Sequence, residues 1–163
     1  MDNSERGQYV LAIGRILIGW MFLWAFLDKM FGLGYETPAG QGVIDGGSPS
    51  SYVEYMTSGL FEGLFKAIAG NGFIDFLLMA GLLILGITIT LGIFTKITTI
   101  SSIAFFLTMF CIVVPPADNP LIDYHVVYLV FMIAVYYLGG YDRLSLFPKW
   151  KELPMVKEFP IIE

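Results

Sequence analysis

The feature that most constrains this chain is a set of four apolar stretches, each close to the length needed to cross a membrane. A helix requires about 20 residues to span the hydrocarbon core of a bilayer. Backbone groups within lipid must find their partners inside the segment, which favours helices over strands. We therefore expect a single all-α domain over residues 1–163, an integral membrane four-helix bundle that ends in a tail at residues 142–163. The expected spans are residues 9–27, 73–94, 97–114 and 122–138.

The overall composition agrees with lipid as the main solvent. Of the 163 residues, 56% are hydrophobic and 14% are charged, whereas about 25% are charged in a typical soluble domain. The net charge of −5 argues against nucleic acid as a partner, because no basic patch is present to neutralise phosphates. The single cysteine, Cys111, and the single histidine, His125, exclude an internal disulfide and a multi-histidine metal or haem site within this chain. We therefore expect no metal, haem or flavin site.

The positions of the basic residues predict the orientation of the spans. Basic residues concentrate in cytoplasmic loops, so the side that carries more of them faces the cytoplasm. The N-terminus, the second loop and the tail together carry six lysines and arginines, against two on the opposite side. We therefore expect a multi-pass protein of the cell membrane with both termini in the cytoplasm. The six are Arg6, Lys96, Arg143, Lys149, Lys151 and Lys157, and the two are Lys29 and Lys66.

The first extracytoplasmic loop, residues 28–72, is expected to divide into two parts. Its first half is rich in glycine and proline, which is typical of irregular structure. In residues 51–69 the apolar side chains recur at close to helical spacing, with charged residues on other faces. This pattern predicts an amphipathic extracytoplasmic helix that lies on the membrane surface or caps the bundle.

Arg15 lies within the first span, where a charge is expensive and tends to serve a function. Its place about six residues into the span puts it roughly 9 Å from the inner end. No carboxylate occurs at that depth in the other spans. Two interpretations stand. Arg15 is a buried cation with spare donors for a ligand, or it reaches the inner headgroups or Asp142.

A set of polar residues is expected at the extracytoplasmic end of the bundle. Lys29 lies two heptads after Arg15 on one seam of the first helix. Asp123 and His125 point about 200° apart in a continuous helix, so His125 is expected to pair with an acid of another segment, Asp28 or Asp75. A histidine beside acids is suited to carry protons in two-electron, two-proton chemistry. The alternative is a ring of solvated helix-end charges. The residues expected around one cavity are Asp28, Lys29, Asp75, Asp123 and His125.

Four segments resemble the DoxX/DoxD family of small four-helix membrane proteins. The segment GRILIGWMFLWAFLDKMFG resembles the first helix of that family, and GLLILGITITLGIFTKITTI resembles its second helix and Gly-rich turn. The segments FKAIAGNGFIDF and NPLIDYHVVYLVFM resemble the entry to the second helix and the fourth helix of the DoxD branch. The similarity covers nearly all of residues 6–145. It implies a quinone-linked oxidoreductase subunit, which in DoxD-like cases moves electrons from thiosulfate to membrane quinone.

We therefore expect a membrane subunit of a quinone-linked oxidoreductase, with quinone as cofactor and with lipid and a second protein subunit or a homo-oligomer as partners. His125 and Asp123 are the expected catalytic residues. Lys29, together with Arg15, Asp28 and Asp75, is expected to bind the quinone or another ligand. The alternative is a non-catalytic assembly or anchoring subunit of a larger respiratory membrane complex, with Arg15 and Lys29 paired to acids of another chain. Solute transport is disfavoured because no pair of broken helices is visible.

Overall fold

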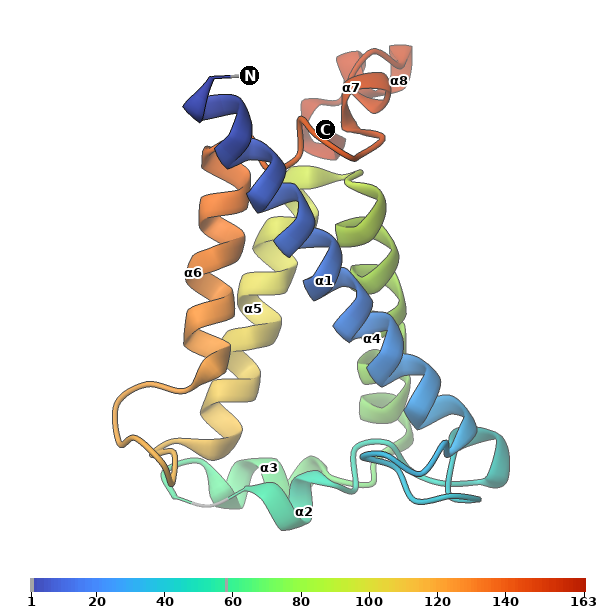
Figure 1. Ribbon diagram of the computed structural model, residues 1–163. Helices are drawn as coiled ribbons and strands as arrows, with labels where there is room; N and C mark the ends of the chain where they lie inside the picture. The colour runs from blue at the N-terminus through green and yellow to red at the C-terminus, as the bar shows by residue number, and fades with distance from the viewer. Residues whose placement is uncertain (1, 58) are drawn as a thin grey trace.

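The computed structural model describes residues 2–57 and 59–163, and in these residues the chain is helical without strands. Four longer helices run alongside one another, and both chain termini lie at the same end (Figure 1). We call this the terminal end, and the opposite end, which carries residues 32–71 and 114–123, the loop end. The longer helices are α1 (Asn3–Phe31), α4 (Gly72–Leu91), α5 (Thr95–Val113) and α6 (Tyr124–Tyr137). The short helices are η1 (Val43–Asp45), α2 (Val53–Met56), α3 (Glu62–Ile68), α7 (Phe147–Trp150), α8 (Pro154–Glu158) and η2 (Pro160–Ile162).

Three of the helices are long and apolar enough to cross a membrane. These are α1 with 29 residues, α4 with 20 and α5 with 19. The fourth expected span corresponds to α6, which has 14 residues. At 1.5 Å per residue it is about 21 Å long, shorter than a hydrocarbon core of about 30 Å. The expected all-α class is confirmed, and three of the four expected spans coincide with membrane-length helices.

Local side-chain chemistry sets where these helices begin and end. Asp2 caps α1 by accepting from the Glu5 backbone N–H, while the Glu5 side chain accepts from the Asp2 N–H, which forms a capping box. This box starts α1 six residues before the predicted span. Gly32 ends the same helix in the left-handed conformation, with φ of +57°. Asn71 caps α4 in the same manner as Asp2 caps α1, by accepting from backbone N–H groups of the first turn.

The core of the bundle is held by close approach of α1 to α4 and by aromatic side chains between α1 and α5. A Cβ atom on Gly19 would lie 2.8 Å from the backbone nitrogen of Thr90, so only glycine permits this crossing. Phe22 of α1 is buried, and its ring lies 5.0 Å from Phe105 and 5.3 Å from Phe106, centroid to centroid. On another side, α4 and α5 diverge and leave a mostly apolar groove of about 610 Å³.

The first loop differs from the single amphipathic helix expected over residues 51–69. Two short helices, α2 and α3, cross the loop end instead (Figure 1), and residue 58 lies outside the described residues. The break follows from a close approach at Gly59, where φ is +98° and a Cβ atom would collide with the Val114 carbonyl. The Leu60 N–H donates to that same carbonyl at 3.3 Å. The loop is thereby fastened to the end of α5.

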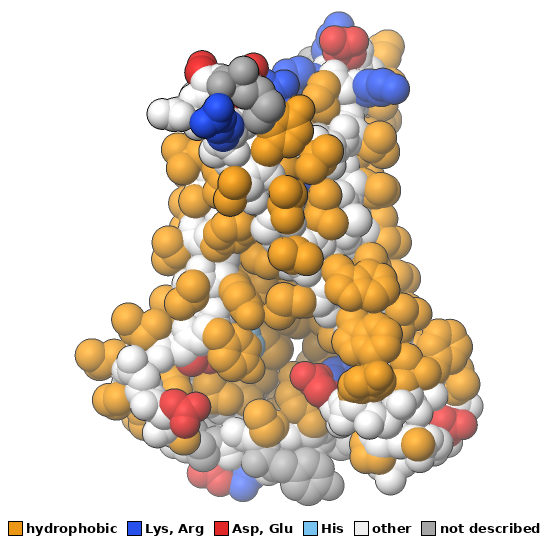
Figure 2. Space-filling view, viewed as in Figure 1, with side chains coloured by type: hydrophobic (Ala, Val, Ile, Leu, Met, Phe, Trp, Pro, Cys, Tyr) orange, Lys and Arg blue, Asp and Glu red, His pale blue; other side chains and the backbone are white. Residues whose placement is uncertain are grey.

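The surface of the long helices is apolar along its length. Figure 2 shows hydrophobic side chains over the middle of the molecule and charged side chains gathered at its two ends. Large side chains such as Leu17, Ile84 and Val130 are more than half exposed. Together with three helices of membrane-spanning length, a surface of this kind supports the interpretation as a membrane protein.

Candidate functional site

Arg15 lies at the terminal end and is fully buried. Its guanidinium group donates five hydrogen bonds to backbone carbonyls, and the contact to Ile89 is the shortest of them. These carbonyls belong to the last turn of α4 and to the segment that follows α6. The other four bonds reach the carbonyl oxygens of Gly140 at 3.2 Å, Thr90 at 2.8 Å, Arg143 at 3.4 Å and Leu144 at 2.7 Å.

Arg15 is a buried cation, as the first sequence-based interpretation expects, but it lacks the spare donors of that interpretation and the contact to Asp142 of the second. A guanidinium group has five N–H donors, and here every one is used within the chain. No donor remains for a ligand, and the partners are carbonyl oxygens rather than lipid headgroups or Asp142. Carbonyls at helix ends lack partners within the helix, and a buried cation can satisfy several at once. The sequence could not reveal these acceptors, because every residue type carries a backbone carbonyl.

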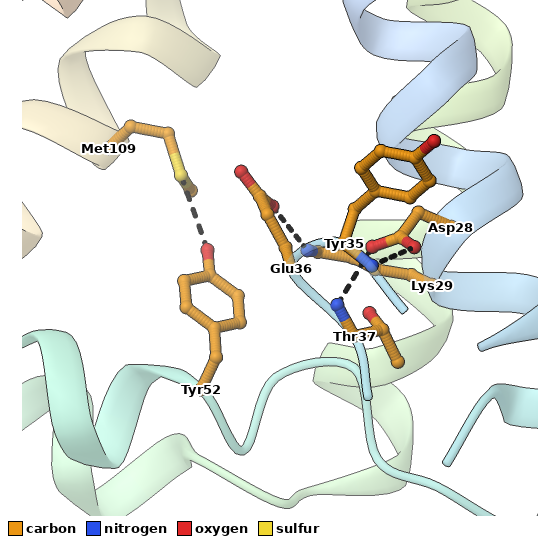
Figure 3. A network of polar contacts seen from close by, with 7 residues as sticks. All are labelled: Asp28, Lys29, Tyr35, Glu36, Thr37, Tyr52 and Met109. Atoms are coloured by element: carbon orange, nitrogen blue, oxygen red, sulfur yellow. Dashed lines mark hydrogen bonds and ion pairs between the residues drawn. The ribbon is translucent and has the colours of Figure 1, made fainter. Parts of the chain in front are cut away.

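Asp28, near the end of α1, also serves the backbone. Its side chain is buried, and it accepts from the N–H groups of Tyr35 at 3.3 Å and Thr37 at 2.8 Å. The carboxylate therefore fixes the loop that follows α1, and it presents the intervening residue, Glu36, toward the interior of the loop end (Figure 3). The expected pairing of Asp28 with His125 does not occur.

Asp75, in the first turn of α4, fixes the second half of the loop by accepting hydrogen bonds from it. One of its oxygens accepts from the Ser48 hydroxyl at 3.0 Å and from the Ser50 N–H at 2.7 Å. The Ser50 hydroxyl in turn accepts from the Gly70 N–H at 3.0 Å. The structure therefore gives Asp75 partners within the loop, and His125 is not among them.

Lys29, by contrast, points into the space enclosed by the loop end (Figure 3). Its ammonium group donates to the Glu36 carboxylate at 2.9 Å and lies 5.0 Å from the centre of the Tyr52 ring. The lysine side chain is 9% exposed, whereas that of Glu36 is 77% exposed. A buried ammonium is thus neutralised by a carboxylate that remains in contact with solvent.

Tyr52 links this pair to α5. Its hydroxyl donates to the Met109 sulfur at 3.4 Å, and a thioether is a weak acceptor. Burial, together with the negative charge of Glu36 and the nearby Tyr124, raises the pKa of Tyr52 to about 12. The phenol therefore stays neutral at physiological pH and keeps its proton to donate.

His125 finds its carboxylate two residues away, so the expectation that Asp123 and His125 cannot meet is wrong. The histidine Nδ1 lies 2.6 Å from the Asp123 Oδ2. The reason is that α6 begins at Tyr124, with Asp123 as its extended N-cap residue, so the two residues do not lie in one continuous helix. An N-cap side chain folds back over the first turn of its helix, where it can reach the side chain of the second helical residue.

Aromatic rings surround this histidine. The Tyr124 ring lies 4.2 Å from the imidazole, and the Phe106 ring lies 6.4 Å from it, centroid to centroid. Figure 2 shows an opening in the surface near the loop end, with acidic and basic side chains at its edge. We define the loop-end site as two groups at the same end of the bundle, namely Lys29 with Glu36 and Tyr52, and Asp123 with His125.

Two residues of the loop-end site, Glu36 and Tyr52, were not predicted from the sequence. Glu36 lies in the glycine- and proline-rich part of the loop, and nothing in its spacing from Lys29 indicates a contact across a turn. Tyr52 was counted with the amphipathic segment. Among the residues that the structure describes, no group of three or more histidine, cysteine, aspartate or glutamate side chains is placed to hold a metal ion.

Comparison of the chain with protein-family models, curated proteins and solved structures gives no match.

Proposed function

We propose that the chain is a four-helix domain of the cell membrane, of the DoxX/DoxD type, in which α6 serves as the fourth crossing. An even number of crossings agrees with both termini lying at one end (Figure 1). The excess of basic residues at the terminal end supports a cytoplasmic location for it. The loop-end site then faces the extracytoplasmic side. A short α6 is compatible with a span because flanking residues 119–123 can extend into the interface.

The proposed function of this domain is that of a membrane subunit of a quinone-linked oxidoreductase, with the quinone ring bound at the loop-end site. The observation that carries the proposal is a buried ammonium group, Lys29, beside the Tyr52 ring, together with a carboxylate-paired histidine in aromatic surroundings at the same end of the bundle. A quinone ring needs flat apolar walls and polar groups at its two oxygens. Phe106 and Tyr124 supply walls, and Lys29, Tyr52 and His125 supply polar groups.

Each residue has a distinct part in this proposal. Lys29 donates a charge-assisted hydrogen bond to one oxygen of the ring, which is stronger than a bond from a neutral donor. His125 exchanges a proton with the other oxygen, and Asp123 holds the imidazole in place. Asp28 and Asp75 act indirectly by fixing the loop. The electrons come from a partner subunit or directly from the substrate.

The test is quinone binding by the full chain in lipid nanodiscs, compared between Lys29→Met and a matched control, Lys66→Met. Both lysines lie at the loop end and pair with one glutamate, but Lys66 is 46% exposed and its partner, Glu62, is not a residue of the loop-end site. Loss of a charge-assisted bond costs about 1.5–3 kcal/mol, so Lys29→Met should weaken binding at least about tenfold. Lys66→Met should leave it unchanged. Equal affinity of both variants and the wild type contradicts the assignment of Lys29.

The alternative, a non-catalytic assembly subunit, gives a different result in the same experiment. Its bundle would bind no quinone, yet it would still copurify with its partner chain. One observation favours a helix from a partner, namely the lipid-facing groove between α4 and α5, which is lined by small side chains such as Gly81, Ser101 and Ala104. Arg15 gives no support to this alternative, because its donors are used inside the chain.

A further inference from the structure

Asp123 makes two kinds of contact with its two carboxylate oxygens. Oδ1 accepts from the backbone N–H groups of His125 at 3.0 Å and Val126 at 3.3 Å, which caps α6. Oδ2 lies 2.6 Å from Nδ1 of the His125 ring. A carboxylate can only accept hydrogen bonds. The proton of the neutral imidazole therefore lies on Nδ1, and Nε2 carries a lone pair.

The Nε2 atom is consequently the part of the ring that is open to a ligand. Among the described residues, none hydrogen-bonds to it. The imidazole ring lies against Tyr124 and Phe106, and its side chain is 15% exposed. The loop-end site thus has an acceptor at His125, which a ligand hydroxyl can complement, and a donor at Lys29 in its other group.

We propose that the loop-end site distinguishes the two redox forms of its ligand and binds the hydroquinone more tightly than the quinone. This inference rests on the proposed function. A hydroquinone hydroxyl donates to Nε2, and the second oxygen accepts from Lys29. A quinone has carbonyl oxygens only, so one of them faces the Nε2 lone pair without a proton between them. An unsatisfied polar contact in a buried site weakens binding by about tenfold.

The substitution Asp123→Asn isolates this effect, because it keeps the cap and reverses the hydrogen bond. The amide oxygen accepts from the same two backbone N–H groups, and asparagine is as good an N-cap as aspartate. The amide nitrogen can only donate, so Nδ1 becomes the acceptor and the proton moves to Nε2. The variant should lose the preference for hydroquinone, so the ratio of its quinone affinity to its hydroquinone affinity should be about tenfold higher than in the wild type. Asp118→Asn, the same change at an exposed acid of the same loop, is the matched control and should keep the preference.

The experiment titrates a short-chain benzoquinone and its hydroquinone, without oxygen, into the full chain in nanodiscs. The chain has a single histidine, so nitrogen-15 NMR of labelled protein shows which ring atom carries the proton, and the titrations are run at a pH where the ring is neutral. A wild-type proton on Nε2, or equal affinity for both forms, overturns the inference and leaves the proposed function standing. Failure to bind either form overturns the proposed function as well. These wild-type measurements decide the question even if Asp123→Asn does not fold.

Discussion

Replacement of Arg15 by leucine should destabilise the bundle, because it removes the group that joins three segments of the chain at the terminal end. The guanidinium connects α1 with the end of α4 and with residues 140–144 after α6. Leucine is close in helix propensity and suits lipid, so neither local structure nor membrane insertion opposes the substitution.

The size of the effect follows from the carbonyls left behind. Two of the five bonds, to Gly140 and Ile89, are buried, and an unsatisfied buried acceptor costs about 1–3 kcal/mol. The sum for these two is about 2–6 kcal/mol. The other three carbonyls are partly exposed, so water or headgroups can replace the arginine there. Lysine in place of Arg15 keeps the charge but has three donors in a different geometry, so Arg15→Lys should recover only part of the loss.

The measurement is the free energy of unfolding in mixed micelles, followed by circular dichroism as the denaturing detergent is increased. Leu17→Ala is the control, since Leu17 lies on the same helix and is 59% exposed. It should change stability by less than about 1 kcal/mol. If Arg15→Leu unfolds at the same detergent fraction as the wild type, the five bonds do not stabilise the fold and the reasoning fails.

Two further predictions concern other parts of the bundle. Gly19→Ala should destabilise the bundle by about 1–3 kcal/mol, because the new Cβ would meet the Thr90 backbone. Gly7→Ala, where the new Cβ would have no atom within 4 Å, should stabilise α1 by up to about 1 kcal/mol. Thermal melts of both variants check these two predictions. Tyr52 should not ionise until about pH 12, so its contribution to stability is present below pH 10 and is lost between about pH 10 and 12. The difference in near-ultraviolet tyrosinate absorbance between wild type and Tyr52→Phe measures this ionisation, and a midpoint near pH 10 would contradict the burial of the phenol.

The sequence was sufficient to predict the helical class and the approximate position of the long helices, because a membrane span has a strong and local signature. The helix ends were harder, since they depend on single capping residues. Asp2 and Glu5 extend α1 beyond the apolar run, and Asp123 caps the start of α6. The break between α2 and α3 depends on contact of Gly59 with the end of α5, which no local pattern encodes.

The candidate site was predicted less well, for a related reason. A search for partners by residue type pairs each charge with an opposite charge, as was done for Arg15 and His125. In the structure, Arg15 and Asp28 bind backbone groups, and Asp75 binds one backbone N–H and one serine hydroxyl. A backbone partner cannot be recognised from residue types in the sequence. Lys29 alone among the ligand-binding candidates points into the loop end, and its partner Glu36 comes from an irregular loop.

The contrast between the two ends of the bundle indicates where a ligand can act. At the terminal end, every N–H donor of Arg15 is used by a carbonyl oxygen, so none is left to bind a ligand. At the loop end, some hydrogen-bond donors remain for a ligand. Lys29 has one hydrogen bond to a described residue and three N–H groups, and Tyr52 donates only to a thioether. Unused donors in a buried position are costly unless a ligand or water completes them.

This contrast predicts that the effects of substitution separate. Arg15→Lys should lower the free energy of unfolding and leave quinone affinity, measured on the folded fraction, unchanged. Lys29→Met should weaken quinone binding without lowering the free energy of unfolding. Methionine fills a similar volume, and the substitution removes a buried charge that only one carboxylate neutralises. Both quantities can be measured on the same nanodisc preparations. If the Lys29 variant loses stability while keeping its affinity, then Lys29 and Glu36 form a structural ion pair, and the loop end is a solvated ring of charges rather than a binding site.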